Sequence, residues 1–111
     1  TLSLVKEGDV RGSITRAALN QQPLRNAPMT VVIAALIERT RKKYGERGAE
    51  RYVAMDAGHI AENIFLQVTA LGLGTVTIGA FSDSDVKDVL GLSDTDVKPL
   101  YLMPVGHITH R

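Results

Sequence analysis

The chain of 111 residues contains no cysteine, which excludes disulfide bonds, thiolate nucleophiles and metals held by cysteine. It also lacks a charge bias: 13 basic and 12 acidic residues give a net charge of +1, too small to attract nucleic acid or an anionic membrane. No apolar run reaches the ~18 residues that span a bilayer, and no signal-peptide pattern opens the chain. We therefore expect a cytoplasmic protein that binds neither nucleic acid nor membrane.

The remaining composition is that of an ordinary globular domain, with 44% hydrophobic and 23% charged residues. No internal repeat or low-complexity tract divides the chain. Its length fits one domain, residues 1–111, or part of a larger one.

The first part of the chain predicts an edge strand followed by a helix. Residues 2–5 alternate weakly between apolar and polar side chains, as a short edge strand does. Asp9 is the expected N-cap of a helix that runs to about Asn20. A break is expected at residues 21–23, because proline disfavours helical geometry in the residue before it, and a second break at residues 26–28.

The middle of the chain predicts a buried strand and a long buried helix. Residues 29–35 form an apolar run rich in β-branched side chains, typical of a strand covered on both faces. A short basic helix or turn follows and ends near Gly45. Residues 47–72 then carry apolar side chains around much of a helical circumference, which indicates burial in a core or against another subunit. Gly72 or Gly74 ends this helix.

The last third predicts a strand, a helix and a central strand. Residues 75–78 are expected to form the first strand, and residues 82–85 to cap a helix that ends near Leu90, before Gly91. Residues 100–105 predict the second strand. Helices between β-rich runs indicate an α+β fold with α/β layering, built on a central sheet and the long helix.

Seven short motifs occur along the chain in one order. They are Ala17–Gln21, Asn26–Pro28 before an apolar strand, Lys43–Arg47, Asp56–His59 with Asn63, Ala70–Gly74, Ile78–Phe81 and Pro104–Gly106. Together they resemble the nitroreductase superfamily of FMN-dependent flavoenzymes. The Lys-Tyr pair within the third motif resembles the SagB-type branch, the dehydrogenases that aromatise azoline rings.

This resemblance implies a homodimer or higher oligomer that holds FMN between subunits and moves a hydride to or from a small molecule. The substrate would be an azoline, a nitroaromatic or a quinone. The chain resembles the C-terminal half of the family's domain, so we expect the flavin-phosphate clamp to be missing unless another chain supplies it. The alternatives are a cofactor-free, truncated relative that acts as a dimeric structural or binding module, and a fragment of a longer enzyme.

The resemblance assigns catalysis to Lys43 and Tyr44. Hydride loss from an azoline ring requires a proton to leave a neighbouring carbon. A lysine whose pKa is lowered by burial, or a tyrosine whose phenolate a lysine stabilises, can accept that proton. The alternative is that Lys43 belongs to a solvated basic face with Arg41 and Lys42, and that Tyr44 only packs at a helix end.

The resemblance also places the cofactor. It puts Ile78, Gly79 and Ala80 beside the flavin ring, where small residues let backbone N–H groups approach N5 and O4; the alternative is a sharp turn at a strand end. It puts the amides of Asn20 and Gln21 at the pyrimidine edge of the ring, which needs both donor and acceptor; the alternative is a helix C-cap.

Other polar residues are weaker candidates. Arg111 would reach the flavin phosphate, or would belong to a disordered tail. Asp56, His59 and Asn63 share a helix face but lack a second strong ligand, so no metal is expected. We expect them to form a buried, hydrogen-bonded stripe at the dimer interface.

Overall fold

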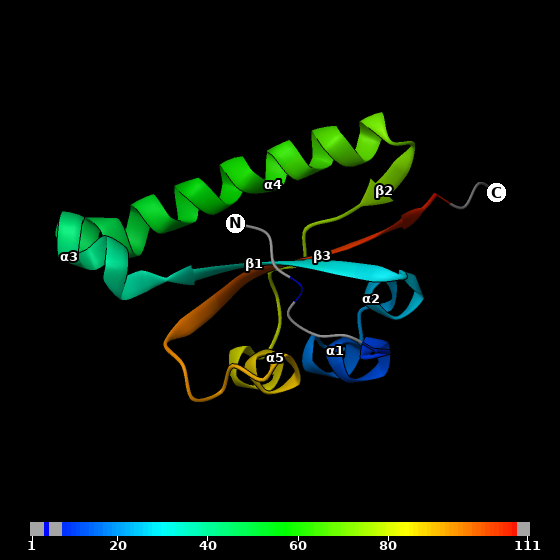
Figure 1. Cartoon of the computed structure of the whole chain (residues 1–111), viewed down its shortest axis with the longest axis horizontal. Helices are drawn as coiled ribbons and strands as arrows, with labels where there is room; N and C mark the ends of the chain where they lie inside the picture. The colour runs from blue at the N-terminus through cyan, green and yellow to red at the C-terminus, as the bar shows by residue number, and fades with distance from the viewer. Residues whose placement is uncertain (1–3, 5–7, 109–111) are drawn as a thin grey trace.

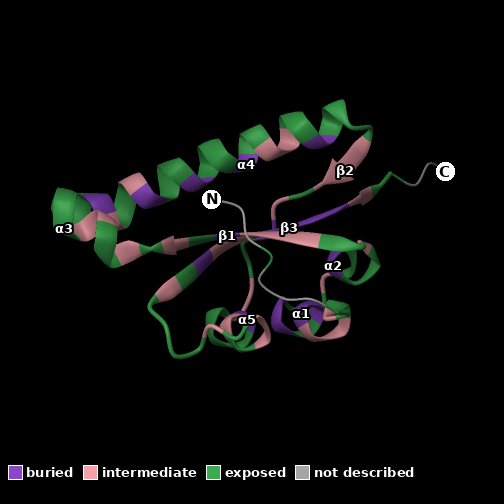
Figure 2. Ribbon diagram, in the orientation of Figure 1, coloured by how far each residue is buried: buried purple, intermediate pink, exposed green. Residues whose placement is uncertain are grey.

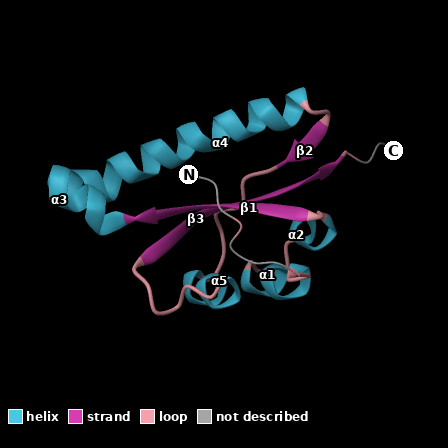
Figure 3. Cartoon of the chain, in the orientation of Figure 1, coloured by secondary structure: helices cyan, strands magenta, loops and turns pink. Residues whose placement is uncertain are grey.

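The computed structural model of the chain describes Leu4 and residues 8–108. Its elements are α1 (Arg11–Ala17), α2 (Gln22–Asn26), β1 (Met29–Leu36), α3 (Ile37–Arg47), the π-helical turn η1 (Gly48–Tyr52), α4 (Val53–Ala70), β2 (Leu73–Thr75), α5 (Asp83–Leu90) and β3 (Val97–His107). The long helix α4 covers one face of a sheet, and α1, α2 and α5 lie on the other (Figures 1 and 3). This layered arrangement confirms the predicted α+β fold.

The sheet has the order β1-β3-β2 and is antiparallel throughout. The strand predicted at residues 100–105 is therefore confirmed, and it lies in the centre. The strand predicted at residues 75–78 is wrong in its bounds. Gly72, with φ of +74°, turns the chain back at once, so Leu73 already pairs with His107. The chain leaves the ladder after Thr75, and Ile78 returns only as an isolated bridge to Leu102.

Alternating side chains of the two long strands build a core on each face of the sheet. On the α4 side, Ile33 and Met103 pack with Ala57 and Ala61. On the other side, the buried residues are Ile14, Ala17, Ala18, Leu24, Ile78, Val86 and Leu102. This alternation is the period of two expected of strands between two layers, and the buried residues in Figure 2 accordingly lie on the inner sides of the helices.

Three predicted helices are confirmed, and local signals delimit α5. Ser82 caps α5 by accepting a hydrogen bond from Asp85 N at 3.4 Å, and Gly91 ends it with φ of +72°. The basic segment forms α3, with a kink at Gly45 where the prediction ended it. Residues 48–70 continue as η1 and α4 and end before Gly72, as predicted.

The first helix differs from the prediction at both ends. Its N-cap is Val10, while the Asp9 carboxylate lies one residue earlier and accepts from Arg11 N at 3.1 Å. The helix ends at Ala17 rather than near Asn20, because Leu19 and Asn20 have φ of 58° and 60° and cannot continue a right-handed helix. Their left-handed geometry reverses the chain toward α2.

The predicted break at residues 21–23 is also wrong, since α2 begins at Gln22. Pro23 lies in the first turn of α2, where a missing N–H costs no hydrogen bond. The second break, at residues 26–28, is confirmed by the end of α2 and the start of β1.

Burial is lower than predicted for β1 and α4. The middle of β1 packs between two layers, but its ends open to solvent: Met29 is 53% and Leu36 37% exposed. One side of α4 is buried, while Met55 and Leu66 on its other side are 57% and 62% exposed. The helix is thus not enclosed by its own chain, and its burial against another subunit stays a prediction.

The edge strand predicted at residues 2–5 falls outside the described residues except for Leu4, which is exposed and in no strand. No described helix combines the length and apolar character that crossing a membrane requires.

Candidate functional site

The segment after β2 passes beside the α1–α2 turn and carries three of the predicted cofactor-binding residues. Ile78 is buried, and its N–H and C=O both bond to Leu102 at 2.9 Å. Since a trans peptide is planar with opposed C=O and N–H, the Ile78–Gly79 peptide directs the Gly79 N–H away from β3. The bonds to β3 therefore fix the direction in which the chain leaves the sheet toward the exposed residues Gly79 and Ala80.

Two hydrogen bonds tie this segment to the α1–α2 turn. Gln21 Nε2 donates to the carbonyl of Ala80 at 2.8 Å, and Ser82 N donates to the carbonyl of Ala17 at 2.9 Å. Gln21 Nε2 also donates to Ala18 O at 3.0 Å. The structure thus brings together four predicted site residues, Gln21, Ile78, Gly79 and Ala80.

The Gly79–Ala80 pair offers free backbone donors. Within the described part of the chain, no atom accepts a hydrogen bond from either N–H. A Cβ added at Gly79 would lie 3.6 Å from Tyr101 Cε1, an ordinary contact. Packing inside the chain therefore does not demand glycine here, and the small residue leaves room for a flat group approaching from outside. An isoalloxazine ring, with electronegative atoms along its edge, fits such a surface.

Asn20 lies at the end of the same turn and is exposed. The C-cap of α1 is Ala18, so the alternative in which Asn20 or Gln21 caps this helix is wrong. The Gln21 amide uses its N–H groups inside the chain and keeps only its oxygen for a ligand. Of the two side-chain amides predicted to bind the flavin, only that of Asn20 belongs to an exposed residue.

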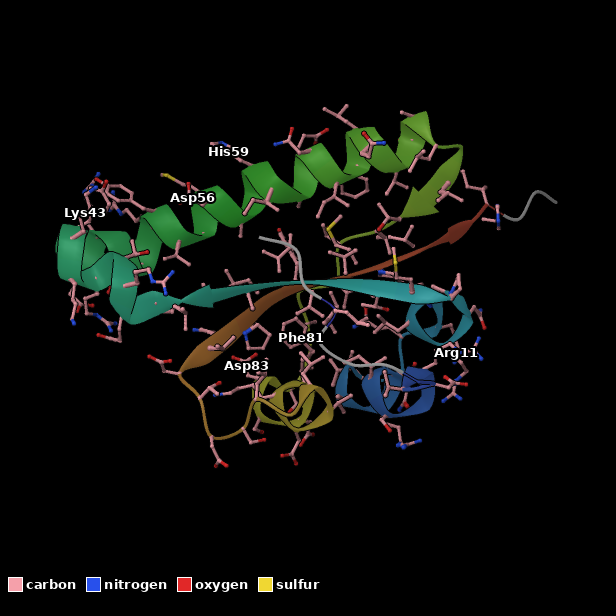
Figure 4. All side chains as sticks on the ribbon, in the orientation of Figure 1. Arg11, Lys43, Asp56, His59, Phe81 and Asp83 are labelled. Atoms are coloured by element: carbon pink, nitrogen blue, oxygen red, sulfur yellow. The ribbon has the colours of Figure 1, made fainter. Side chains whose placement is uncertain are left out.

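Lys43 and Tyr44 lie elsewhere, on α3 just before the kink at Gly45. Lys43 Nζ is 5.3 Å from the centroid of the Tyr44 ring, a cation–π geometry. Figure 4 shows Lys43 at one end of the molecule and Phe81, which follows the Gly79–Ala80 pair, near its middle. A single chain does not bring the two catalytic candidates to the cofactor segment.

The basic run around Lys43 is partly neutralised. Arg41 forms ion pairs with Glu38 and with Glu46, the latter at 2.8 Å. Lys42 and Lys43 are exposed. Of the three residues proposed to form a solvated basic face, Arg41 is therefore neutralised by ion pairs, whereas Lys42 and Lys43 remain exposed to solvent.

Sequence reasoning missed the support beneath Tyr44. Its ring packs edge to face on Tyr52, and the buried Gly48 lies between their helical turns. The signal was the spacing of four from Tyr44 to Gly48 and again to Tyr52, although the kink at Gly45 separates Tyr44 from the helical turn that carries the other two.

The predicted polar stripe is not buried within the chain. Asp56, His59 and Asn63 are exposed on the side of α4 away from the sheet; Figure 4 labels the first two. Among residues 8–108, no group of three or more potential metal-binding side chains lies together. Arg111 falls outside the described residues.

An open cavity of about 280 Å³ lies between β1, α3 and α4. Arg39 and Asp56 contribute its charged atoms, and Ile33, Val53 and Ile60 contribute apolar walls. None of the described residues predicted to bind the cofactor or to act in catalysis lines it, so it is separate from the Gly79–Ala80 segment.

Comparison with known proteins identifies the family of the chain. The family model described as "Nitroreductase family" matches residues 2–107. A curated protein of Methanocaldococcus jannaschii, named "Putative nitroreductase MJ1384", is 44% identical over 102 residues, covering 92% of this chain and 50% of that protein. The chain thus spans about half the length of the curated relative it matches.

Solved structures share the fold. A protein of Anabaena variabilis described as a "putative nitroreductase" superposes with a TM-score of 0.83 at 29% identity, over 92% of this chain and 20% of the other. The NADPH:FMN oxidoreductase of Vibrio harveyi, solved with NAD+, gives 0.71 at 25% identity, over 91% and 49%. The family match covers nearly the whole chain, and the chain belongs to the nitroreductase family.

Proposed function

We propose that the chain is a subunit of an FMN-dependent oxidoreductase that transfers a hydride between the flavin and a small molecule. The observation that carries this proposal is the exposed Gly79–Ala80 pair. No atom of the described residues accepts a hydrogen bond from its N–H groups, and hydrogen bonds of Ile78 and of the Ala80 carbonyl hold the segment on both sides. The similarity to an NADPH:FMN oxidoreductase supports the choice of cofactor.

The chain's own residues have distinct tasks at this site. FMN, when bound, supplies a centre that accepts or donates a hydride. The N–H groups of Gly79 and Ala80 donate hydrogen bonds to the electronegative edge of the ring. Asn20 offers an amide with both donor and acceptor to the pyrimidine edge. Arg111 remains the proposed phosphate contact.

The proposed proton acceptors, Lys43 and Tyr44, come from a second copy of the chain. In one chain Lys43 lies at the end of the molecule and Phe81 near its middle (Figure 4), so we assign completion of the site to a homodimer. The exposed side chains of Met55 and Leu66 on the outward side of α4 supply apolar surface for that dimer. Burying such side chains is the usual driving force of obligate association.

The Lys43–Tyr44 pair supports an azoline as substrate. Lys43 Nζ lies 5.3 Å from the centroid of the Tyr44 ring, so the two side chains proposed to remove a proton from the ring carbon lie side by side. Nitroaromatics and quinones need no such carbon acid and are the competing substrates. This assignment to the azoline-dehydrogenase branch rests on the pair alone.

Turnover assays with an azoline, a nitroaromatic and a quinone test the proposal. Lys43→Ala and Tyr44→Phe should each lower azoline oxidation about 10²- to 10⁴-fold, the usual contribution of general acid–base catalysis. Flavin content should stay unchanged. Lys42→Ala, which removes the neighbouring exposed lysine, is the matched control and should retain activity.

Equal losses for Lys42→Ala and Lys43→Ala would contradict the assigned role. A stable dimer that binds no flavin and turns over none of the three substrates would instead indicate the cofactor-free binding module.

A further inference from the structure

The amide nitrogen of Gln21 is fully engaged within the chain. Nε2 donates to Ala18 O at 3.0 Å and to Ala80 O at 2.8 Å. A primary amide has two N–H donors, so neither remains for a ligand. Gln21 and Ala80 are separated by 59 residues. One side chain therefore joins the α1–α2 turn to the segment that faces the proposed flavin.

Hydrogen bonds fix the peptide planes on both sides of Ala80 N–H. The carbonyl of Ile78 accepts from Leu102 N, which fixes the Ile78–Gly79 plane. The carbonyl of Ala80 accepts from Gln21, which fixes the Ala80–Phe81 plane. The peptide that carries the Ala80 N–H lies between these two planes. Gln21 thus supplies one of the two constraints on the direction of that N–H.

The turn that presents Gln21 is itself tightly defined. Leu19 and Asn20 both have positive φ, which is unfavourable for residues with a Cβ and persists only where surrounding contacts enforce it. Asn20 N bonds to Thr15 O at 2.8 Å, and Gln21 N to Ala18 O at 3.3 Å. These bonds hold the Gln21 backbone at one place relative to α1.

We infer that Gln21 is a positioning residue: it holds the Ala80 carbonyl inward so that the Ala80 N–H group stays oriented toward the cofactor, whereas the bond between Ile78 and Leu102 orients the Gly79 N–H. It acts through Ala80 and does not donate to the flavin, in contrast to the role expected from the sequence. The effect on a cofactor rests on the proposed function, whereas the bridge is a property of the chain alone.

The flavin-free protein tests the bridge. Gln21→Met keeps the side-chain length and removes the amide, and Gln22→Met is the same change at the adjacent exposed residue. In Gln21→Met, the NMR resonance of the Ala80 carbonyl carbon should move. The Ser82 amide proton, which bonds to Ala17 O, should exchange about tenfold faster, as expected when a local opening becomes easier. Gln22→Met should match the wild type in both.

Gln21→Glu provides a second variant if Gln21→Met does not fold. An ionised carboxylate has the same length and no donor, so it should give the same two changes. Wild-type values for both the Ala80 resonance and Ser82 exchange, in a folded variant, would overturn the inference.

The flavin-bound protein tests the consequence. Gln21→Met should bind FMN about three- to tenfold more weakly, the usual effect of losing one hydrogen bond, and should shift the midpoint potential of the bound flavin. Wild-type affinity and potential alongside an altered flavin-free segment would overturn the positioning role. If the wild type binds no FMN, the proposed function fails while the flavin-free experiment still decides whether the bridge exists.

Discussion

The rings of Tyr44 and Tyr52 meet edge to face, with centroids 5.4 Å apart and planes at 80°. Tyr44 is 51% exposed and Tyr52 half-buried, so the pair forms at the surface, where α3 meets η1. Lys43 adds its charge to the Tyr44 ring. The orientation of the proposed proton acceptors therefore depends on a residue that takes no part in the chemistry.

Removing the Tyr52 ring should release Tyr44. Tyr52→Leu is expected to lower the free energy of unfolding by about 0.5–1.5 kcal/mol, the usual value of an aromatic pair beyond its buried area. The ring-current shifts of the Tyr44 protons should diminish in the NMR spectrum. Tyr52→Phe keeps the ring and should preserve both. Unchanged Tyr44 shifts in Tyr52→Leu would show that the pair does not persist in solution.

The close packing at Gly48 predicts a destabilising methyl group. A Cβ there would lie 2.8 Å from Tyr44 Cβ and 3.1 Å from Thr40 O, neither of which can move freely. Gly48→Ala should cost about 1–3 kcal/mol of stability, as overpacking does. At Gly12 the same Cβ meets only the flexible end of Arg16, at 3.5 Å, so Gly12→Ala should be neutral or slightly stabilising. Urea denaturation that ranks the two variants equally would refute this explanation.

Local signals in the sequence predicted most elements of the fold. Ser82 and Gly91 delimit α5, because a side-chain cap and a left-handed glycine act within a few residues. The apolar run that forms β1 and the long pattern that forms α4 were equally recognisable. The same local reasoning failed at Pro23. Proline disrupts the interior of a helix but is well tolerated in the first turn, so its presence alone does not show whether a helix ends or begins there.

Long-range relationships could not be predicted. β2 begins at Leu73 because its partner β3 sets the register, whereas the β-branched residues favoured a later strand. The family resemblance brought Gln21 and Ala80 to attention, but nothing local indicates that one holds the other. The separation of Lys43 from the cofactor segment likewise appears only in three dimensions.

The ion pair between Asp9 and Arg11 predicts that the stability of the N-terminal end of α1 falls at low pH. Hydrogen bonds from the Arg11 side chain and backbone lower the pKa of Asp9 from 3.8 to about 2. Because the folded pKa is depressed, the stabilisation is complete above the unfolded pKa and disappears as the pH falls toward 2. NMR titration of the Asp9 carboxyl carbon should show this value. Arg11→Leu should return it toward 3.8, and 1 M salt should move it the same way because both groups are exposed.

If the outward side of α4 forms the dimer interface, one charge introduced there should disrupt the dimer. Leu66 is 62% exposed in the isolated chain. Leu66→Asp should weaken dimerisation by about 100-fold or more, since an unpaired carboxylate would be buried in the interface. Asn26→Asp adds the same charge on α2, on the opposite face of the sheet, and should leave the dimer intact. Light scattering distinguishes the two; a wild type that is monomeric at micromolar concentration would contradict the predicted interface.

The most direct test of the proposed function is the visible absorbance spectrum of the natively purified protein, with the released flavin counted per chain. The exposed Gly79–Ala80 donors and the family membership predict near-stoichiometric FMN. A colourless protein that forms a dimer and takes up no FMN on incubation would contradict the proposal.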